Sequence, residues 1–494
     1  MTNNHTIPTF DSPATPRADR RWWVALLVVM AMFCAAMASY SVLRHHNLWS
    51  DVYDLGQEIQ VHWNTAHGRP FESSVEVQNN LGDHVTFVNL ITAVPYRVFN
   101  APETLLILQP IVFAIGALAV FRIGLFYLHS APLAWTAAVA YLAQPAAGYA
   151  LGYEYHPMVY CAPFALWCFD AAMRGRLALA AALFVCLLGC REDAGMAAAA
   201  VGVFVLFATP YRKTGVVMAL LGMAWFVTAM FVLLPYFRGG PSDSIDRFAF
   251  FGDSSREVMT NSLTRPDMVI DRLMQDTRRI TFIPHLSLAW LGASLLTVAG
   301  WLGLILTAGL GILSSSETKW TIGASQPLVI LPIVTLAGIL GLRRLMRWFP
   351  QLTTPRGVAV VMTLWLAALA VQNLDSVFVR NRWQMSYNPL RDELAQLRPL
   401  IPEDAALSAT SKMGAQFAQR PQLAIYPITQ WDPDEFPKVQ KHRAEYVLIQ
   451  TTQARLEPQH LEPDLTQYEL LRVTEQLRLY RLRGDGDGSM ARAD

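Results

Sequence analysis

The stretch GCREDAG, residues 189–195, places an arginine, a glutamate and an aspartate (191–193) between two runs of apolar and small residues. LALAAALFVCLL (177–188) precedes it and MAAAAVGVFVLFA (196–208) follows it. A helix needs about 20 apolar residues to cross a bilayer, and a charge at its centre costs about 2.5 to 3.5 kcal/mol. We therefore expect the stretch to form a turn between two short membrane helices, with its charges at the membrane boundary.

Composition indicates a membrane location for the whole chain. Of its 494 residues, 53% are hydrophobic and 16% are charged, against about 25% charged residues in an average soluble domain. The mean hydropathy is +0.28. The lipid bilayer is the expected partner, and a net charge of +1 without a long basic run argues against nucleic acid. All five cysteines lie in apolar runs, so the sequence predicts neither a disulfide framework nor a cysteine metal site.

Apolar runs predict an α-helical polytopic membrane domain over residues 22–376, with about eleven transmembrane helices. The polar residues 1–21 are expected to be disordered and cytoplasmic. The first helix follows them, and its apolar run is too long for a signal-peptide core. The other predicted helices cover residues 104–127, 132–151, 157–173, 176–190, 194–209, 214–236, 281–297, 298–313, 322–342 and 357–376.

Clusters of arginine and lysine predict the orientation. With the N-terminus inside the cell, the clusters beside the helices lie on the inner side, as the positive-inside rule requires. They are Arg17, Arg20 and Arg21; Arg174 and Arg176; Arg212 and Lys213; and Arg343, Arg344, Arg347 and Arg356. Counting the apolar residues 85–99 as a span would invert the later loops, so we predict a helix in the membrane interface there. Loops 44–103 and 237–280 and the C-terminus then lie on the outer side of the membrane.

The outer loop 44–103 contains an amphipathic helical pattern. One row is apolar and an adjacent row is polar, the first with Val52, Leu55, Ile59 and Trp63 and the second with Asp51, Asp54, Glu58 and His62. A helix lying on the membrane surface would bury the first row and hold the second beside the mouths of the spans. Such a row can supply a general base and can ligate a divalent cation. The alternative is that the acids are only the solvated face of the helix.

Other polar residues fall on the same outer side. Asp83 and His84 precede the interfacial helix, where Asp83 could equally be a helix cap. In the turn GYEYHP, Glu154 and His156 stand at the membrane boundary as candidates for substrate binding. The alternative for this pair is an aromatic-belt feature with the neighbouring tyrosines.

Three further cations are candidates for binding an anion. Arg278 and Arg279 begin a predicted span at the end of loop 237–280, where a guanidinium could hold a lipid phosphate bidentately. Lys319 lies in the outer loop SSSETKW. Its alternative role is that of a lysine that extends its ammonium toward water from the membrane interface.

The composition changes after the last predicted helix. NPLRDELAQLRPL carries the start signals of a helix, and short apolar runs follow at about 405–410, 422–428, 444–451, 468–474 and 476–483. We therefore predict a small extracytoplasmic α/β domain over 377–483, which could recognise an acceptor or only cap the outer face. Residues 484–494 are predicted to be a disordered tail.

Several motifs resemble a known family when they are taken together. YDLGQEIQVHWNTAHGRPFESS, LGDH, AYLAQPAAGYALGYEYHP and CREDAG occur in the order typical of the bacterial membrane-protein family called domain of unknown function 2079. The resemblance runs from about residue 45 to residue 450 and includes ALSATS and EYVLI in the C-terminal part.

In layout this family is similar to the GT-C class of membrane glycosyltransferases. That resemblance implies transfer of a sugar from a polyprenyl-phosphate carrier to an envelope glycan, lipid or protein on the outer face of the inner membrane. By position in the first outer loop, Asp54 would be the catalytic acid or base. The analogy concerns layout, so the reaction itself is argued from the residues.

The residues suggest a mechanism for such a transfer. Asp54 would act as general base, oriented by Glu58 or His62, and cations would stabilise the departing phosphate. Arg191 is the first candidate cation, and Glu192 and Asp193 would orient it. If a divalent metal ion, Mg²⁺ or Mn²⁺, takes over part of this work, the expected ligands are Asp54, Glu58 and Asp83. These three acids, with Glu192 and Asp193, form the predicted catalytic set.

Two other classes of protein remain open from the sequence. A transporter or flippase is expected to carry ionisable residues near the midplane in corresponding halves of a repeat, and we find no such repeat. A noncatalytic assembly protein would not need the polar row of the first loop.

Overall fold

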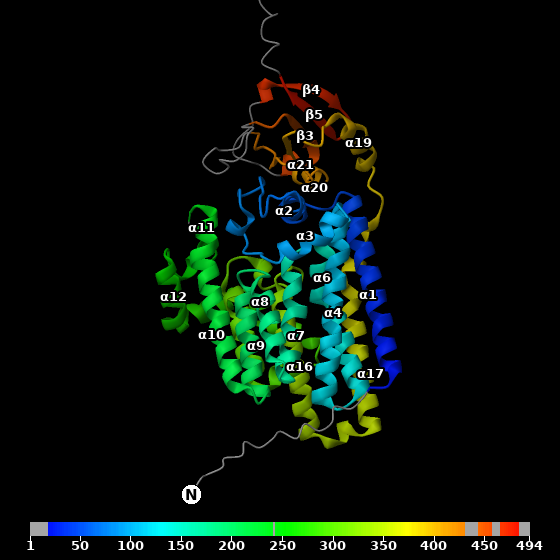
Figure 1. Ribbon diagram of the computed structural model, residues 1–494, viewed down its shortest axis with the longest axis vertical. Coiled ribbons are helices and arrows are strands. Elements are labelled where there is room, and N and C mark those ends of the chain that lie inside the picture. Colours follow the sequence, from blue (N-terminus) through cyan, green and yellow to red (C-terminus); the bar gives the residue numbers. More distant parts are fainter. Residues whose placement is uncertain (1–17, 241–242, 430–442, 457–464, 484–494) are drawn as a thin grey trace, which may run out of the picture.

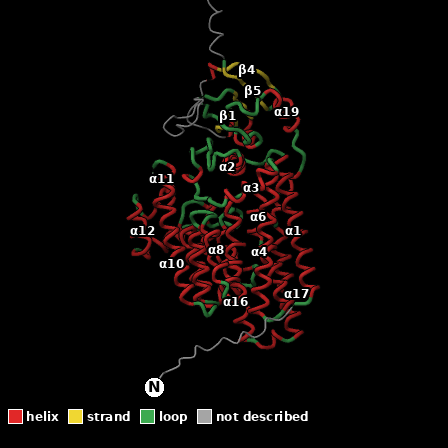
Figure 2. Tube along the Cα trace, in the orientation of Figure 1, coloured by secondary structure: helices red, strands yellow, loops and turns green. Residues whose placement is uncertain are grey.

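The computed structural model describes residues 18–240, 243–429, 443–456 and 465–483. The predicted disordered tail 484–494 and most of the predicted N-terminal segment 1–21 lie outside the described residues. Figure 1 shows a bundle of helices with a small C-terminal sheet stacked on one end, and Figure 2 shows that strands occur only in that sheet region of the drawn chain. We call this end of the bundle the sheet end.

Five helices in the described part of the chain are long and apolar enough to cross a membrane. They are α1 (Arg20–His46), α4 (Pro102–Leu128), the continuous run Arg212–Arg238 formed by α10, η4 and α11, α16 (Pro327–Trp348), and the run Pro355–Arg380 that begins with α17 (Pro355–Gln372). Four shorter apolar helices accompany them: η3 with α7 (Pro157–Met173), α8 (Leu177–Leu188), α9 (Ala194–Ala208) and α15 (Val298–Leu313). A polytopic helical protein is thus confirmed, but the number of eleven spans is not.

Two predicted spans are divided in the structure. The predicted span 132–151 consists of α5 (Ala131–Leu142) and α6 (Pro145–Tyr153), because Pro145 lacks the amide proton that would continue α5. The predicted span 281–297 contains the end of α14 (Thr277–Leu288) and then a 3-10 turn.

Glycines bring α9 and α10 (Arg212–Thr228) into close contact. A Cβ atom at Gly202 would lie 2.4 Å from the backbone nitrogen of Ala219, and one at Gly222 would lie 2.5 Å from that of Ala199. Small residues allow membrane helices to approach this closely. The contact fixes α9, and with it the turn 189–195 at its start.

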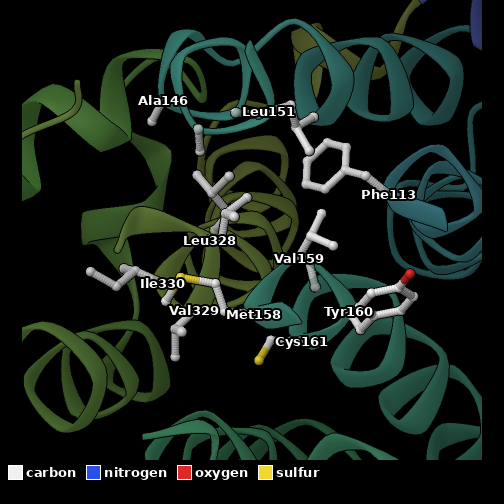
Figure 3. Close-up of a cluster of buried hydrophobic side chains, with 14 of the residues drawn as sticks. Phe113, Ala146, Leu151, Met158, Val159, Tyr160, Cys161, Leu328, Val329 and Ile330 are labelled. Atoms are coloured by element: carbon white, nitrogen blue, oxygen red, sulfur yellow. The ribbon is translucent and has the colours of Figure 1, made fainter. Parts of the chain in front are cut away.

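An apolar core supports the sheet end from below. Figure 3 shows Phe113 of α4, Leu151 of α6, Val159 of η3 (Pro157–Tyr160) and Leu328 of α16 in one cluster. These four side chains are buried. Close packing of this kind resists displacement, so the loops above it rest on a rigid base.

The C-terminal part forms one five-stranded sheet with the order β2-β1-β3-β5-β4. Its strands are β1 (Leu407–Ala409), β2 (Leu423–Ile425), β3 (Tyr446–Gln450), β4 (Tyr468–Val473) and β5 (Leu477–Leu482). β1 pairs in parallel with β2 and β3, whereas β5 pairs antiparallel with β3 and β4. α19 (Leu390–Leu397) precedes the sheet. The small C-terminal sheet predicted from the apolar runs is thereby confirmed.

The first loop lies between the bundle and this sheet, as Figure 1 shows for α2 (Gln57–Ala66). A π-helical turn, η1 (Val52–Gly56), precedes α2 and contacts α20 (Ser411–Ala415). The backbone nitrogen of Val52 donates to the hydroxyl of Ser411 over 3.1 Å. The polar row is therefore not a solvated helix face: Glu58 is 8% exposed and His62 is 0% exposed.

The second predicted interfacial helix is α3 (Asn89–Val98). It buries Asn89, Thr92, Ala93 and Tyr96 against the protein and exposes the apolar side chains of Leu90, Ile91, Val94 and Val98. It is amphipathic and is not among the helices long enough to cross a membrane, which agrees with the predicted helix in the interface.

Candidate functional site

Asp54 lies on the π-helical turn. The backbone nitrogen of Gly56 donates to the carbonyl of Asp51 over 3.0 Å, a hydrogen bond that spans five residues. Such turns are rare in proteins and frequent at functional sites. Val52 and Leu55 of the turn are buried, whereas Asp54 is partly exposed. Within the described residues its carboxylate makes no hydrogen bond or ion pair, so it is free to bind a ligand.

Glu154 holds this turn from below. Its Oε1 accepts hydrogen bonds from the backbone nitrogen of Asp51 over 2.9 Å and from Nη1 of Arg44 over 3.0 Å, and its Oε2 accepts one from the backbone nitrogen of Leu55 over 2.7 Å. Burial raises the pKa of Glu154 to about 8, although Arg44 opposes this rise. The side chain is 0% exposed and does not line the cavities described below. Glu154 is therefore a positioning residue for the turn that carries Asp54.

We expect Glu154→Gln to destabilise the protein strongly. The amide keeps only one accepting oxygen and leaves the buried Arg44 without a carboxylate, a change that typically costs about 3 to 5 kcal/mol. Thermal unfolding in detergent would measure the loss. The control is Glu103→Gln, which removes the half-exposed pair with His46 and should cost less than about 1 kcal/mol. Equal losses in the two variants would contradict this role.

The stretch GCREDAG forms a turn between α8 and α9, as predicted. In this turn the carboxylate of Glu192 binds the start of the interfacial segment. Glu192 Oε1 accepts from His84 Nδ1 over 3.1 Å, and its Oε2 accepts from the backbone nitrogen of Val85 over 3.1 Å. Arg191 Nε lies 3.1 Å from Glu192 Oε1 and 3.5 Å from Asp193 Oδ1. Glu192 and Asp193 thus hold Arg191 in place.

The charges of the turn shift one another's pKa values. Burial alone would raise the pKa of Glu192, but His84 and Arg191 outweigh it and lower that pKa well below its usual value. Burial would lower the pKa of His84, but Asp83 and Glu192 raise it overall. The turn therefore favours ionised Glu192 beside a protonated His84.

Two cavities adjoin this turn. The loop cavity has a volume of about 520 Å³ and lies above the turn, against Asp54 and Glu58 of the first loop. The groove cavity has a volume of about 180 Å³ and lies among α9, α10, η4, α15 and α16. Residues common to both cavities include Asp83, His84, Arg191, Arg247, Lys319 and Gln326. The two cavities therefore lie on either side of one charged centre.

The groove cavity is charged at one end and apolar beyond it. Arg191, Arg247 and Lys319 lie at the charged end. Its apolar lining comes from Met196, Phe226, Met230, Leu310, Val329 and Ile330. This combination suits a ligand with an anionic head and a hydrocarbon tail.

Lys319 is a partly buried cation of this centre. No carboxylate in the described part of the chain lies within ion-pair distance of its ammonium. Burial, and then Arg191, lowers the pKa of Lys319 to about 7. An anion bound between Lys319 and Arg191 would offset the burial of the ammonium and its repulsion from Arg191, because a nearby opposite charge favours the charged form of a group.

The loop cavity offers hydrogen-bond acceptors on the side of the first loop. Gln57 donates through Nε2 to Asn80 and to Asp83 over 2.8 and 2.9 Å, whereas its buried Oε1 has no partner. His156 Nε2 is also buried without a partner, and burial lowers the pKa of His156. Together with the Asp54 carboxylate, these atoms form a wall that fits a ligand bearing hydroxyl groups.

Two predicted residues of the first loop serve mainly in packing. Glu58 borders the loop cavity, but its Oε2 accepts from Asn89 Nδ2 over 3.0 Å, and burial raises its pKa to about 8. His62 is enclosed, with Nδ1 2.7 Å from the carbonyl of Glu58 and Nε2 2.7 Å from the hydroxyl of Thr92. Neither side chain is bonded to Asp54 in the described structure, so the expectation that one of them orients Asp54 is not met.

The structure places Arg278 and Arg279 outside the cavities. Arg278 is exposed and pairs with Asp276 and Glu317. Arg279 is buried and donates to the carbonyls of Ile312 and Ser314. These contacts fasten the start of α14 to the end of α15.

Asp54, Glu58 and Asp83 all border the loop cavity, but they do not fit a metal-ligand set. No group of three or more His, Cys, Asp or Glu side chains within the described ranges is arranged to hold a metal ion. The raised pKa of Glu58 favours its protonated form, which is a poor ligand. We derive no step through a metal ion.

Three cavity residues were missed by the sequence analysis. Gln57 was missed because it is an uncharged residue among acids. Arg247 was missed because it is one of seven arginines in loop 237–280, and nothing distinguishes it from the others. Tyr53 borders the loop cavity beside Asp54. Helical spacing offered a signal only for Gln57, which lies three residues after Asp54.

The bundle of apolar helices, with two cavities that share a charged lining beneath a small C-terminal sheet, defines a polytopic membrane protein. The chain belongs to the family of predicted membrane proteins designated DUF2079, which it matches over residues 44–483.

Solved structures and curated sequences were also compared. The chain is similar to ArnT from Cupriavidus metallidurans bound to undecaprenyl phosphate, at 12% identity over 94% of this chain and 98% of that chain, with a TM-score of 0.48. For ArnT from the same organism in the apo state the identity is 12%, the coverage is 93% and 97%, and the TM-score is 0.42. No curated protein sequence matches significantly.

Proposed function

We propose that the protein is a membrane glycosyltransferase. It would move a hexosyl or pentosyl group from a polyprenyl-phosphate carrier to an envelope glycan, lipid or protein on the outer face of a bacterial inner membrane. The observation that supports the proposal is that an apolar groove and the cavity that contains the free Asp54 carboxylate share one cationic lining, formed by Arg191, Arg247 and Lys319.

The groove cavity fits the carrier. Its apolar side chains suit the prenyl chain, and Arg191 with Lys319 suits the phosphate. A guanidinium binds phosphate oxygens with two parallel hydrogen bonds, whereas an ammonium acts as a point charge. The sugar would then project into the loop cavity, where Gln57 Oε1 and His156 Nε2 can accept hydrogen bonds from its hydroxyl groups.

The transfer would proceed at the junction of the two cavities. Asp54 takes the proton of the acceptor hydroxyl as its oxygen forms a bond to the anomeric carbon. The bond from that carbon to the phosphate oxygen breaks, and its electron pair leaves with the polyprenyl phosphate. Arg191 and Lys319 stabilise the charge that the leaving group gains.

The pKa of Lys319 predicts a pH dependence of carrier binding. Because this pKa is lowered to about 7, the ammonium is charged below that pH and loses its charge as the pH rises. A phosphodiester keeps its single charge throughout, so we expect the Kd for the carrier to rise about tenfold between about pH 6.5 and 8.5. Titration of the purified protein with a fluorescent polyprenyl-phosphate hexose would measure it. Lys319→Arg should flatten the profile, and an unchanged profile in that variant would assign the dependence to another group.

The experiment that tests the function uses the purified protein in liposomes. A radiolabelled polyprenyl-phosphate hexose and an envelope extract are supplied, and the label is followed into a new covalent product. Label that crosses the sealed membrane without any covalent product would instead identify a transporter. Deletion of the gene, followed by analysis of envelope glycans and lipid-linked sugars, would identify the acceptor.

A further inference from the structure

A third cavity lies beside the loop cavity. This side cavity has a volume of about 470 Å³ and lies among the α5–α6 junction, α14, the end of α17 and the loop 321–323. Gly323 borders both cavities. The short loop before α16 therefore forms the partition between the side cavity and the loop cavity.

One wall of the side cavity holds an unsatisfied polar group. Gln144 is 2% exposed, and its Nε2 donates to the carbonyl of Leu286 over 3.0 Å. Its Oε1 is buried and has no partner. A buried acceptor without a donor costs about 1 to 3 kcal/mol, so a ligand that brings a hydroxyl group there would recover this loss.

The rim of the side cavity belongs to helices that face lipid. The run Pro355–Arg380 is only 11% buried, and Leu288, which borders the cavity, is 47% exposed. Asp375 and Arg380 also border the cavity and form a loose pair over 3.9 Å. The exposed rim of the cavity thus combines an apolar side chain, Leu288, with the charged pair Asp375 and Arg380, and its buried wall holds the unpaired oxygen of Gln144.

We infer that the side cavity binds the hydroxyl-bearing headgroup of an envelope lipid and passes it across Gly323 to Asp54. This inference rests on the proposed function, and it selects a lipid from the acceptor classes considered above. The carrier occupies the groove among α9, α10, α15 and α16, whereas the acceptor enters between α14 and α17. The two substrates therefore reach the loop cavity from different sides.

Gly323→Trp tests the passage. A Cβ atom at Gly323 has only the hydroxyl oxygen of Thr321 within 4 Å, at 3.9 Å, so a side chain can begin there without a clash, and the bulk of an indole would obstruct the proposed passage. The matched control is Gly309→Trp in α15, where only Ile305 lies within 4 Å, also at 3.9 Å. In liposomes with a radiolabelled polyprenyl-phosphate hexose, transfer to envelope lipid and release of free sugar by water are measured separately.

We expect Gly323→Trp to lower transfer to envelope lipid at least about tenfold, a change of about 1.4 kcal/mol, and to lower release of free sugar several-fold less than transfer. Gly309→Trp should change neither rate. Retained transfer in Gly323→Trp, or an equal fall in both rates, overturns the inference. If the unaltered protein shows neither reaction, the proposed function fails instead.

A binding measurement keeps the inference testable in that case. A photoreactive glycosyl diacylglycerol should label the peptides that contain residues 285–288 and 372–381, and Gln144→Leu should reduce this labelling about tenfold because the accepting oxygen is lost. Labelling that Gln144→Leu leaves unchanged overturns the inference. Full competition by the free headgroup sugar would identify a soluble glycan as the ligand and would overturn the choice of a lipid.

Discussion

Replacing Asp54 with Asn is expected to lower the rate of sugar transfer by about 10² to 10⁴, the usual contribution of a general base. The amide has nearly the same shape as the carboxylate but does not take up a proton. Asp54 borders the loop cavity and has no bonded partner in the described residues, so the free energy of unfolding should change by less than about 0.5 kcal/mol. Initial rates with a labelled carrier, together with thermal unfolding, would separate the two effects.

The matched control is Asp51→Asn on the same turn. Asp51 accepts a hydrogen bond from the hydroxyl of Ser411 over 3.2 Å and does not border either cavity. Its replacement should leave transfer within a few-fold. If Asp54→Asn transfers sugar at the normal rate while inserting stably, Asp54 is not the base.

Replacing Arg191 with Met is expected to have the second largest effect on transfer. Removal of one group that stabilises developing charge typically costs about 10² to 10³ in rate. This variant should also unfold more easily, because Glu192 loses a partner 3.1 Å away and stays buried. Carrier affinity and transfer rate are therefore measured on protein that is shown to be folded.

Arg191→Lys separates charge from packing. The ammonium keeps the positive charge but loses the planar pair of donors, so transfer should recover partly and stay below the normal rate. Glu192→Gln is the control for stability, since it weakens the ion pair with His84 but keeps the positive charge of Arg191. Arg191 acts only in packing if the Lys and Met variants bind the carrier equally well.

The sequence predicted those features that depend on local patterns. The turn at GCREDAG follows from charge between two apolar runs, and the five strands follow from short apolar runs separated by polar residues. The amphipathic α3 follows from helical spacing in the same way. Each of these patterns is contained within about 30 consecutive residues.

Features that depend on distant contacts could not be predicted. Glu154 looked like a substrate residue at the membrane boundary, but the structure pairs it with Arg44, which is 110 residues away in the chain. The polar row on α2 looked solvated because the sequence does not show that α3 packs against α2 and encloses Glu58 and His62. The number of spans also depends on packing, since a helix as short as α8 packs along α7 and α9.

Because α20 contacts the π-helical turn, the surroundings of Asp54 are completed only by a segment that is synthesised late. Ser411 reaches Val52 and Asp51 across nearly three quarters of the chain. A ribosome makes the membrane helices first, so Asp54 obtains its final surroundings only after the C-terminal sheet has folded onto the loop. An incomplete chain would thus insert into the membrane with its base still unplaced, and lipid-linked sugar would not be consumed before synthesis ends.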